Sequence, residues 1–167
     1  MFRKIEDFLT TWEHESQATQ KLFDALTDAS LAQPVARDHR TLGRMAWHIA
    51  ATIPEMMGLT GLKLAGPAPQ DGVPAQATKI RQAFHDASRS LAEQIKSNWS
   101  DESLTVTDPM YGETWARGST LFGLVAHQCH HRGQMTVLMR QAGLKVPGVY
   151  GPSYEEWAGY GAEPPAI

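Results

Sequence analysis

Four long stretches of this chain carry apolar residues three or four positions apart, which is the spacing of one face of an α-helix. The pattern predicts helices from about residue 2 to 29, 42 to 59, 74 to 98 and 119 to 143. Each helix must bury its apolar stripe, and four helices achieve this around one shared core. The sequence therefore predicts an all-α four-helix bundle, formed by residues 1–167 as a single domain.

Residues that begin, interrupt and end helices mark the limits of these stretches. Thr41 is a capping residue type and precedes the second stretch, whereas Pro54 lies inside it and predicts a kink or an early end. Gly143 follows the fourth stretch, at a position where glycine commonly ends a helix. The segment GPAPQDGVP, residues 66–74, has the composition of a loop and predicts a crossover connection between the second and third helices.

Two shorter segments do not follow the helical pattern. Residues 104–107 and Glu113–Ala116 flank the turn-rich sequence DPMYG, which predicts a small hairpin or a structured loop before the last helix. The final segment, about 144–167, is too rich in glycine and proline for regular structure. We expect its aromatic side chains to pack this tail onto the bundle; they are Tyr150, Tyr154, Trp157 and Tyr160.

Charge and cysteine content exclude several classes of protein. Lys and Arg total 15 against 18 Asp and Glu, and the two signs are interspersed, which disfavours nucleic acid as a partner. The single cysteine, Cys129, rules out an intrachain disulfide framework. The amino terminus has charges within its apolar run, unlike a signal peptide, and no window has the roughly 18 apolar residues of a membrane span. We therefore expect a cytoplasmic protein that does not insert into membranes.

The segment HQCHHRGQM, residues 127–135, places three histidines in the fourth predicted helix. His127 and His131 are four positions apart, so they lie about 40° apart around the helix axis and point the same way. The same face carries Leu124 and Met135, so both imidazoles lie in the stripe that the bundle buries. Since an unpaired buried polar group costs on the order of 1–3 kcal/mol, each ring needs a partner, and a shared metal ion provides one.

The second predicted helix supplies a third imidazole. His48 lies on its apolar stripe with Met45 and Met56, and facing helices of a bundle can bring such side chains to one site. Three neutral imidazoles with an open fourth position form the arrangement that catalytic zinc and related divalent ions use. Glu55 is the nearest carboxylate on the same face and is a candidate general base or supporting group. A chance histidine pair and a solvated glutamate are the alternatives.

The other candidate residues have simpler explanations. His130 lies about 100° from His131 around the helix, at the edge of the stripe, and fits a supporting role. Cys129 lies on the face opposite His127, which favours a small packing residue over a catalytic thiol. We expect the remaining histidines to lie at the surface and the tryptophans to serve packing, with the last two also able to form pocket walls: His14, His39, His85, Trp47, Trp115 and Trp157.

These motifs together resemble the DinB family of DinB/YfiT-like metalloenzymes. The resemblance rests on TLGRMAWHIA in the second helix, HQCHHRGQMTVLMRQAG in the fourth and VPGVYGPSYEEWAGYG at the end, and it covers nearly the whole chain. It implies a four-helix bundle that binds a divalent cation, often nickel or zinc, through one histidine of the second helix and two of the fourth. In this sequence those ligands would be His48, His127 and His131.

The resemblance also bears on activity. Related proteins of the superfamily resemble thiol-dependent S-transferases and a maleylpyruvate isomerase, which use a low-molecular-weight thiol at the metal. We therefore expect a metal-dependent enzyme that activates water or a thiol, as a hydrolase or a thiol S-transferase, on a small-molecule substrate. The alternative is a non-catalytic metal-binding bundle with a role in stress response or partner binding, which a fourth protein ligand would favour.

A second, largely apolar stripe lies on the fourth predicted helix, roughly opposite His127. Its residues are Phe122, Val125, Cys129 and Gly133. A helix that is apolar on two sides is usually covered on both, here by the aromatic tail or by a second copy of the chain. The resemblance favours the second copy, so we expect a homodimer with this helix near the interface and a metal site that opens toward Tyr111 and Trp115.

Overall fold

The computed structural model describes residues 2–68 and 70–166, and within them four α-helices form the predicted all-α bundle. The helices are α1 (Ile5–Asp24), α2 (Leu42–Gly58), α3 (Ala77–Asn98) and α4 (Arg117–Gln141). The short elements are the 3₁₀ helices η1 (Ala29–Ala32), η2 (Asp101–Thr105) and η3 (Tyr154–Tyr160), and the strands β1 (Thr107–Met110) and β2 (Glu113–Ala116). None of the helices in the described part of the chain is long and apolar enough to cross a membrane.

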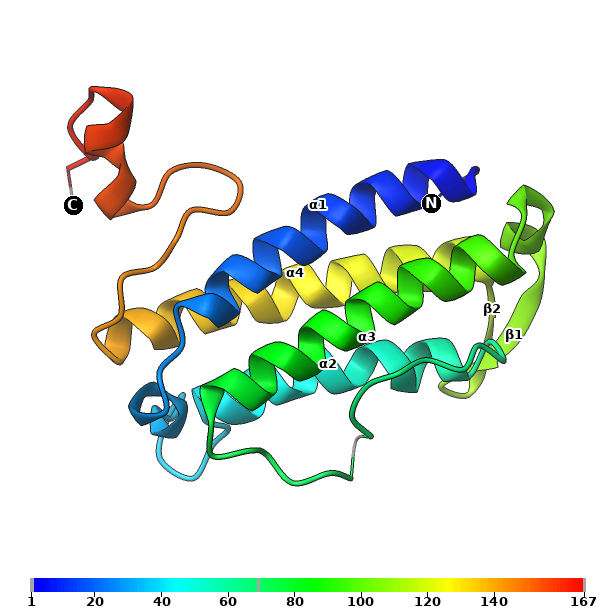
Figure 1. Ribbon diagram of the computed structural model, residues 1–167, viewed down its shortest axis with the longest axis horizontal. Helices are drawn as coiled ribbons and strands as arrows, with labels where there is room; N and C mark the ends of the chain where they lie inside the picture. Colours follow the sequence, from blue (N-terminus) through cyan, green and yellow to red (C-terminus); the bar gives the residue numbers. More distant parts are fainter. Residues whose placement is uncertain (1, 69, 167) are drawn as a thin grey trace.

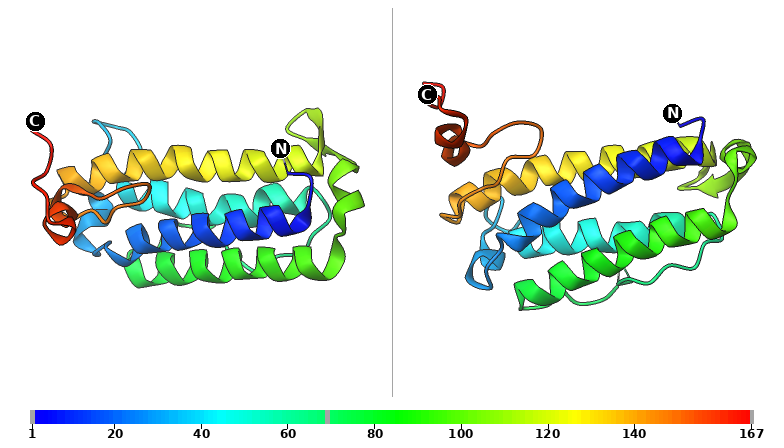
Figure 2. Two further views of the ribbon diagram at one scale, coloured as in Figure 1. Left: turned by 90° about the horizontal axis from the view of Figure 1, so that it is seen from above. Right: turned by 45° about the horizontal axis from the view of Figure 1, so that its top comes forward.

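The connections place the two histidine-bearing helices side by side. α1 packs against α3 and α4, and α2 packs against the same two helices. α2 and α3 run in the same direction, so the 59–76 connection returns along the bundle before α3 begins, which is the predicted crossover (Figure 1). The hairpin and η2 lie at one end of the bundle and the carboxyl-terminal tail at the other (Figure 2). As a result, α2 and α4 face each other along their length.

The core lies between the four helices and is formed by the apolar stripe of each. Phe8 and Phe23 of α1, Phe84 of α3, and Ile49 and Ile53 of α2 are fully buried. The rings of Phe23 and Phe84 pack with their centroids 4.8 Å apart and so join α1 to α3. Burying each of these side chains stabilises the folded state by roughly 1.5–3 kcal/mol.

Local hydrogen bonds set the helix ends. Thr41 caps α2 as predicted, because its side-chain oxygen accepts a hydrogen bond from the Arg44 backbone N–H at 3.2 Å. The helix continues to Gly58, so it does not end early at Pro54, which removes only one backbone donor from a largely buried helix. α4 ends as predicted: Gly143 has a φ of 76°, a left-handed conformation in which its N–H reaches back to the last turn.

Four other predicted helix limits differ from the structure, and the first of them is the start of α1, at Ile5 instead of near residue 2. α1 ends at Asp24 instead of near residue 29, because Thr27 and Ser30 exchange hydrogen bonds between their side chains and backbone N–H groups and start η1. α3 begins at Ala77 instead of near residue 74, and its first backbone N–H is satisfied by the Asp28 carboxylate at 2.7 Å. α4 begins two positions before the predicted Ser119.

The hairpin is present, but its first strand lies later than predicted. Residues 104 and 105 belong to η2, which begins with a capping box at Ser100. β1 therefore starts at Thr107 and pairs with β2, the predicted second strand, in antiparallel register. Tyr111 and Gly112 form the two-residue turn, and both have the positive φ, 52° and 85°, that a type I′ hairpin turn requires.

The first part of the carboxyl-terminal tail packs on the bundle, whereas η3 is joined to it by an ion pair between Glu155 and Arg140 of α4. Val146 is buried, and the Tyr150 hydroxyl reaches a buried polar cluster between α1 and α4. Tyr154 and Tyr160 are 60% and 72% exposed, and η3 contains no buried residue. The prediction that these two tyrosines pack the tail onto the bundle is therefore wrong.

Candidate metal centre

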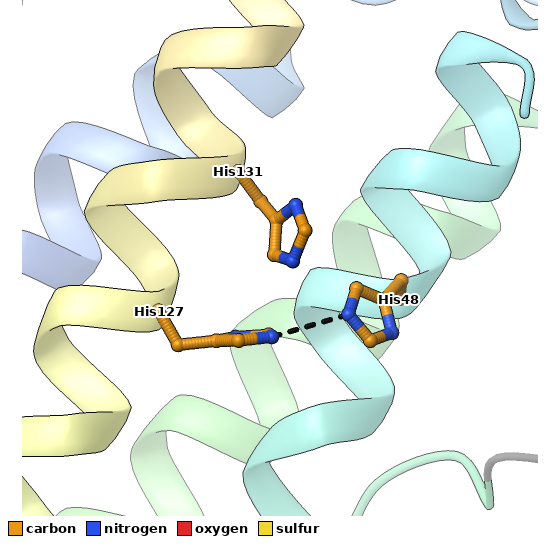
Figure 3. A group of neighbouring side chains, drawn as sticks. All are labelled: His48, His127 and His131. Carbon is orange, nitrogen blue, oxygen red and sulfur yellow. Dashed lines mark hydrogen bonds between the residues drawn. The ribbon is translucent and has the colours of Figure 1, made fainter.

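Three imidazoles converge between α2 and α4. His48 projects from α2, and His127 and His131 project from successive turns of α4 (Figure 3). The ring centroids lie 4.4–5.0 Å apart. His48 Nε2 is 3.2 Å from His127 Nε2, and one nitrogen of each ring lies within 4.8 Å of the other two. The structure thus brings together the three residues selected from the sequence.

The spacing of α2 and α4 at this site is fixed by close packing on either side of it. Gln128 is buried, and its side-chain amide donates to the Ile49 carbonyl of α2 at 3.0 Å. At Gly123, a Cβ atom would come within 3.3 Å of Met56 and of Trp115, so glycine permits close approach of the helices there. Sequence reasoning missed Gln128, although its place within the histidine-rich segment 127–135 of a buried helix was a usable signal.

A side-chain hydrogen bond fixes the orientation of the His131 ring. The ring atom Nδ1 lies 2.7 Å from the Gln134 Oε1 atom, and because that oxygen can only accept, Nδ1 carries the proton. His131 Nε2 therefore keeps its lone pair free for a ligand. The Gln134 amide nitrogen lies 3.2 Å from Nε2 of His130, which is exposed. This contact gives His130 the supporting position that its place at the edge of the stripe predicted.

The surroundings of the cluster favour neutral imidazoles. Burial, followed by repulsion from His131 and His127, lowers the pKa of His48 to about 4. Burial, followed by repulsion from His131 and His130, lowers the pKa of His127 to about 4. Burial also lowers the pKa of His131. Because a neutral imidazole is the form that binds metal ions, the three rings are in the ligating state at neutral pH.

The donor set fits a divalent ion. Four ligands placed tetrahedrally at zinc–nitrogen distances leave about 3.3 Å between neighbouring nitrogens, close to the 3.2 Å that separates His48 Nε2 from His127 Nε2. Imidazole is a preferred ligand of zinc and nickel. In the described part of the chain, no fourth His, Cys, Asp or Glu joins the group. Three donors of this kind leave at least one coordination position open.

Comparison with known proteins identifies the family. The DinB family profile matches residues 1–165. The chain belongs to the DinB family. It is 47% identical over all 167 residues to the uncharacterized protein YrdA of Bacillus subtilis strain 168, with the whole of both chains covered.

Solved DinB structures agree with the fold. The crystal structure of a DinB-like protein from Bacillus cereus ATCC 10987 matches with a TM-score of 0.87 and 46% identity, covering 90% of this chain and 100% of that one. A DinB-like protein of Bacillus subtilis, YjoA, matches with a TM-score of 0.66 over 86% of this chain and 97% of that one. Its 12% identity supports the fold alone.

The low histidine pKa values predict how metal binding by this DinB protein depends on pH. At pH 5.5, three imidazoles with an ordinary pKa near 6.5 would bind metal about a thousandfold more weakly than at neutral pH. We expect the Zn²⁺ dissociation constant to rise by about tenfold at most. His48 and His127 each have a pKa of about 4, so at pH 5.5 both rings are still neutral and able to bind the ion. Calorimetric titration with Zn²⁺ between pH 5 and 7.5 measures this. Release of three protons for each Zn²⁺ bound across that pH range would contradict the lowered pKa values of the histidines.

Glu55 lies away from the metal centre of this DinB protein. It shares the face of α2 with His48, but seven residues separate the two, which is about 10 Å along a helix axis. Its carboxylate accepts a hydrogen bond from the Tyr111 hydroxyl at 3.4 Å, at the hairpin end of the bundle. The structure therefore does not bring Glu55 to the three histidines, and a role as their general base has no geometric support.

The cavity that reaches the histidines opens at the other end of the bundle. It has a volume of about 400 Å³ and is lined by His131 together with residues from the 35–45 segment and the last turns of α4. No residue of the hairpin lines it. This cavity lies at the start of α2, whereas the predicted opening was toward Tyr111 and Trp115. Sequence reasoning missed this wall because the segment before α2 carries no motif.

The other residues singled out in the sequence lie at the surface or contribute to packing. His14 and His85 are exposed, as expected. Trp47 is buried and donates to the Asp71 carbonyl at 3.1 Å, which holds the crossover connection against α2. Burial raises the pKa of the Cys129 thiol, so this residue is not an activated nucleophile.

Part of the second apolar stripe of α4 is covered by the tail. The Tyr150 hydroxyl lies 2.9 Å from the Cys129 sulfur. Phe122 is 55% exposed, and Gly133 is exposed as well. The tail thus covers one residue of the stripe, and Val125 packs against the core of the bundle itself. The homodimer expected to cover Phe122 and Gly133 stays a prediction.

Proposed function

We propose that this DinB protein is a divalent-metal-dependent enzyme that uses water or a thiol as its nucleophile. In this proposal His48, His127 and His131 hold one zinc or nickel ion. The observation that carries it is the convergence of three neutral imidazoles from two helices, with no fourth ligand residue beside them in the described part of the chain. Such an open set of donors is typical of catalytic sites, whereas structural sites have four protein ligands.

The chemistry divides between the ion and the chain. When bound, a divalent ion supplies the Lewis acidity that makes a water molecule or a thiol nucleophilic near neutral pH. Gln134 orients the His131 ring, and Gln128 holds α2 at the distance that the three rings require. The cavity beside His131 admits a small molecule to the same point. Hydrolysis and thiol transfer both need the three imidazoles held in place and a cavity beside them, so the proposal includes both reactions.

Cobalt-substituted protein tests for the open coordination position. Co²⁺ takes zinc-type sites, and its visible spectrum reports the number and kind of its ligands. We expect 2-mercaptoethanol to shift these bands and to add a sulfur-to-cobalt charge-transfer band in the wild type. A spectrum that responds to neither 2-mercaptoethanol nor cyanide would show a closed shell and would support the non-catalytic metal-binding bundle.

Two model reactions then test for catalysis. The first is hydrolysis of 4-nitrophenyl acetate, in which water oxygen bonds to the carbonyl carbon and 4-nitrophenol leaves. The second is transfer of cysteine to 1-chloro-2,4-dinitrobenzene, in which sulfur bonds to the ring carbon, chloride leaves and the thiol proton passes to solvent. We expect at least one rate above background with the zinc- or nickel-loaded protein. His131→Ala should abolish that rate, and the surface variant His14→Ala should retain it.

A further inference from the structure

The cavity beside His131 combines an apolar wall with two further basic side chains, those of His39 and Arg40. The apolar wall is formed by Val35, Met45, Val137 and Leu138, and Arg40 is part of the same lining. A volume of about 400 Å³ is within the range of small-molecule sites. Because His131 is itself part of the lining, a molecule bound here lies next to the three histidines.

Among the described residues, Arg40 has no acidic partner in an ion pair; Arg44 has none either, but of the two only Arg40 lines the cavity. Arg37, on the same segment, lies 3.7 Å from Asp38, and Arg132 and Arg140 each contact a glutamate. No acidic residue lines the cavity. The positive charge of Arg40 also contributes to lowering the pKa of all three clustered histidines, which places it near them. An unpaired guanidinium beside an apolar wall suits a ligand with one anionic group.

We infer that this cavity is the substrate pocket and that it takes a small amphipathic carboxylate, with the anionic group at Arg40 and an apolar body against Val137 and Leu138. Its role in catalysis rests on the proposed function, because only a bound ion beside His131 would give the pocket a reaction to serve. Its ability to bind such a ligand does not depend on the ion, so the two ideas can be tested apart.

The test uses metal-free protein, so that no ion can bind the carboxylate. Calorimetric titrations compare butanoate, hexanoate and octanoate with the neutral analogue hexanamide. We expect hexanoate to bind at least about tenfold more tightly than hexanamide, since the anion gains a charge-assisted hydrogen bond. Affinity should rise about fourfold for each added methylene that the wall buries. Imidazole NMR signals should locate the ligand, with His131 shifting and the remote His85 unchanged.

Two pairs of variants separate the anion site from the wall. Arg40→Gln should remove the preference for hexanoate over hexanamide, whereas Arg37→Gln, the same change three positions earlier, should keep it. Val137→Glu should weaken hexanoate binding about tenfold by placing a carboxylate in the pocket. Phe122→Glu is its matched control, because both side chains are exposed on α4, to 57% and 55%, and Phe122 does not line the cavity.

Equal binding of hexanoate and hexanamide, equal effects of Arg40→Gln and Arg37→Gln, or no dependence on chain length would each overturn the inference. Zn²⁺ binding is measured on the same preparations. Selective hexanoate binding by a protein that binds no Zn²⁺ would support the pocket and contradict the proposed function. Zn²⁺ binding without carboxylate selectivity would contradict the pocket alone.

Discussion

Replacing His127 with alanine is expected to abolish stoichiometric binding of Zn²⁺ or Ni²⁺, and His48→Ala and His131→Ala are expected to do the same. Each of the three rings offers one nitrogen to the same point. Loss of a direct ligand should weaken binding by more than about a hundredfold, because even the loss of a residue that only supports a ligand typically weakens it ten- to a hundredfold. Metal analysis of protein purified without chelator or nickel resin, followed by titration calorimetry, measures the effect.

The matched control is His130→Ala. His130 belongs to the same motif but is exposed, and it contacts the site only through Gln134, so most of the binding should remain. Stability gives a second measurement. Because the ion would tie α2 to α4, chelation should lower the melting temperature of the wild type and leave that of His131→Ala unchanged. Loss of the ion in His130→Ala with retention in His127→Ala would show that the ligands are assigned wrongly.

Glu15→Gln is expected to lower the free energy of unfolding by about 3–5 kcal/mol, because it leaves the charge of Arg132 buried without a counter-ion. Arg132 is 2% exposed, and its guanidinium contacts the Glu15 carboxylate at 2.5 Å and the Tyr150 hydroxyl at 2.6 Å. Burial alone would raise the pKa of Glu15, but hydrogen bonds from Tyr150 and Arg132 lower it overall, so the ion pair is intact at neutral pH. Urea unfolding at pH 7 measures the change.

The same substitution at an exposed ion pair provides the control. Glu93 and Arg89 are one turn apart on α3 with both side chains 65% exposed, so Glu93→Gln should cost about 0.5 kcal/mol or less. The double variant Glu15→Leu, Arg132→Met should be more stable than Glu15→Gln, since apolar side chains of similar size leave no buried charge. Equal, small losses in Glu15→Gln and Glu93→Gln would mean that the buried pair does not hold the bundle together.

The sequence allowed the three clustered histidines to be chosen, because direction around a helix is a local property. Residues four positions apart share a face in any α-helix, so His127 and His131 could be paired without knowledge of the fold. The same reasoning misplaced Glu55. A helical wheel projects every residue onto one plane and discards its height along the axis, and Glu55 lies about 10 Å from the level of His48.

The spacing of residues along the chain was enough to predict the four helices, the buried face of each and the inward direction of the imidazoles. These follow from the spacing of apolar residues within windows of roughly 11–18 residues, which is a local property of the chain. The levels at which α2 and α4 meet could be known only from the folded chain, because they depend on contacts between residues that are distant in the sequence. Gln128 meets the Ile49 carbonyl across 79 positions, and Arg132 meets Glu15 across 117. Such pairs form only when packing has fixed the relative heights of the helices, and no local pattern encodes them.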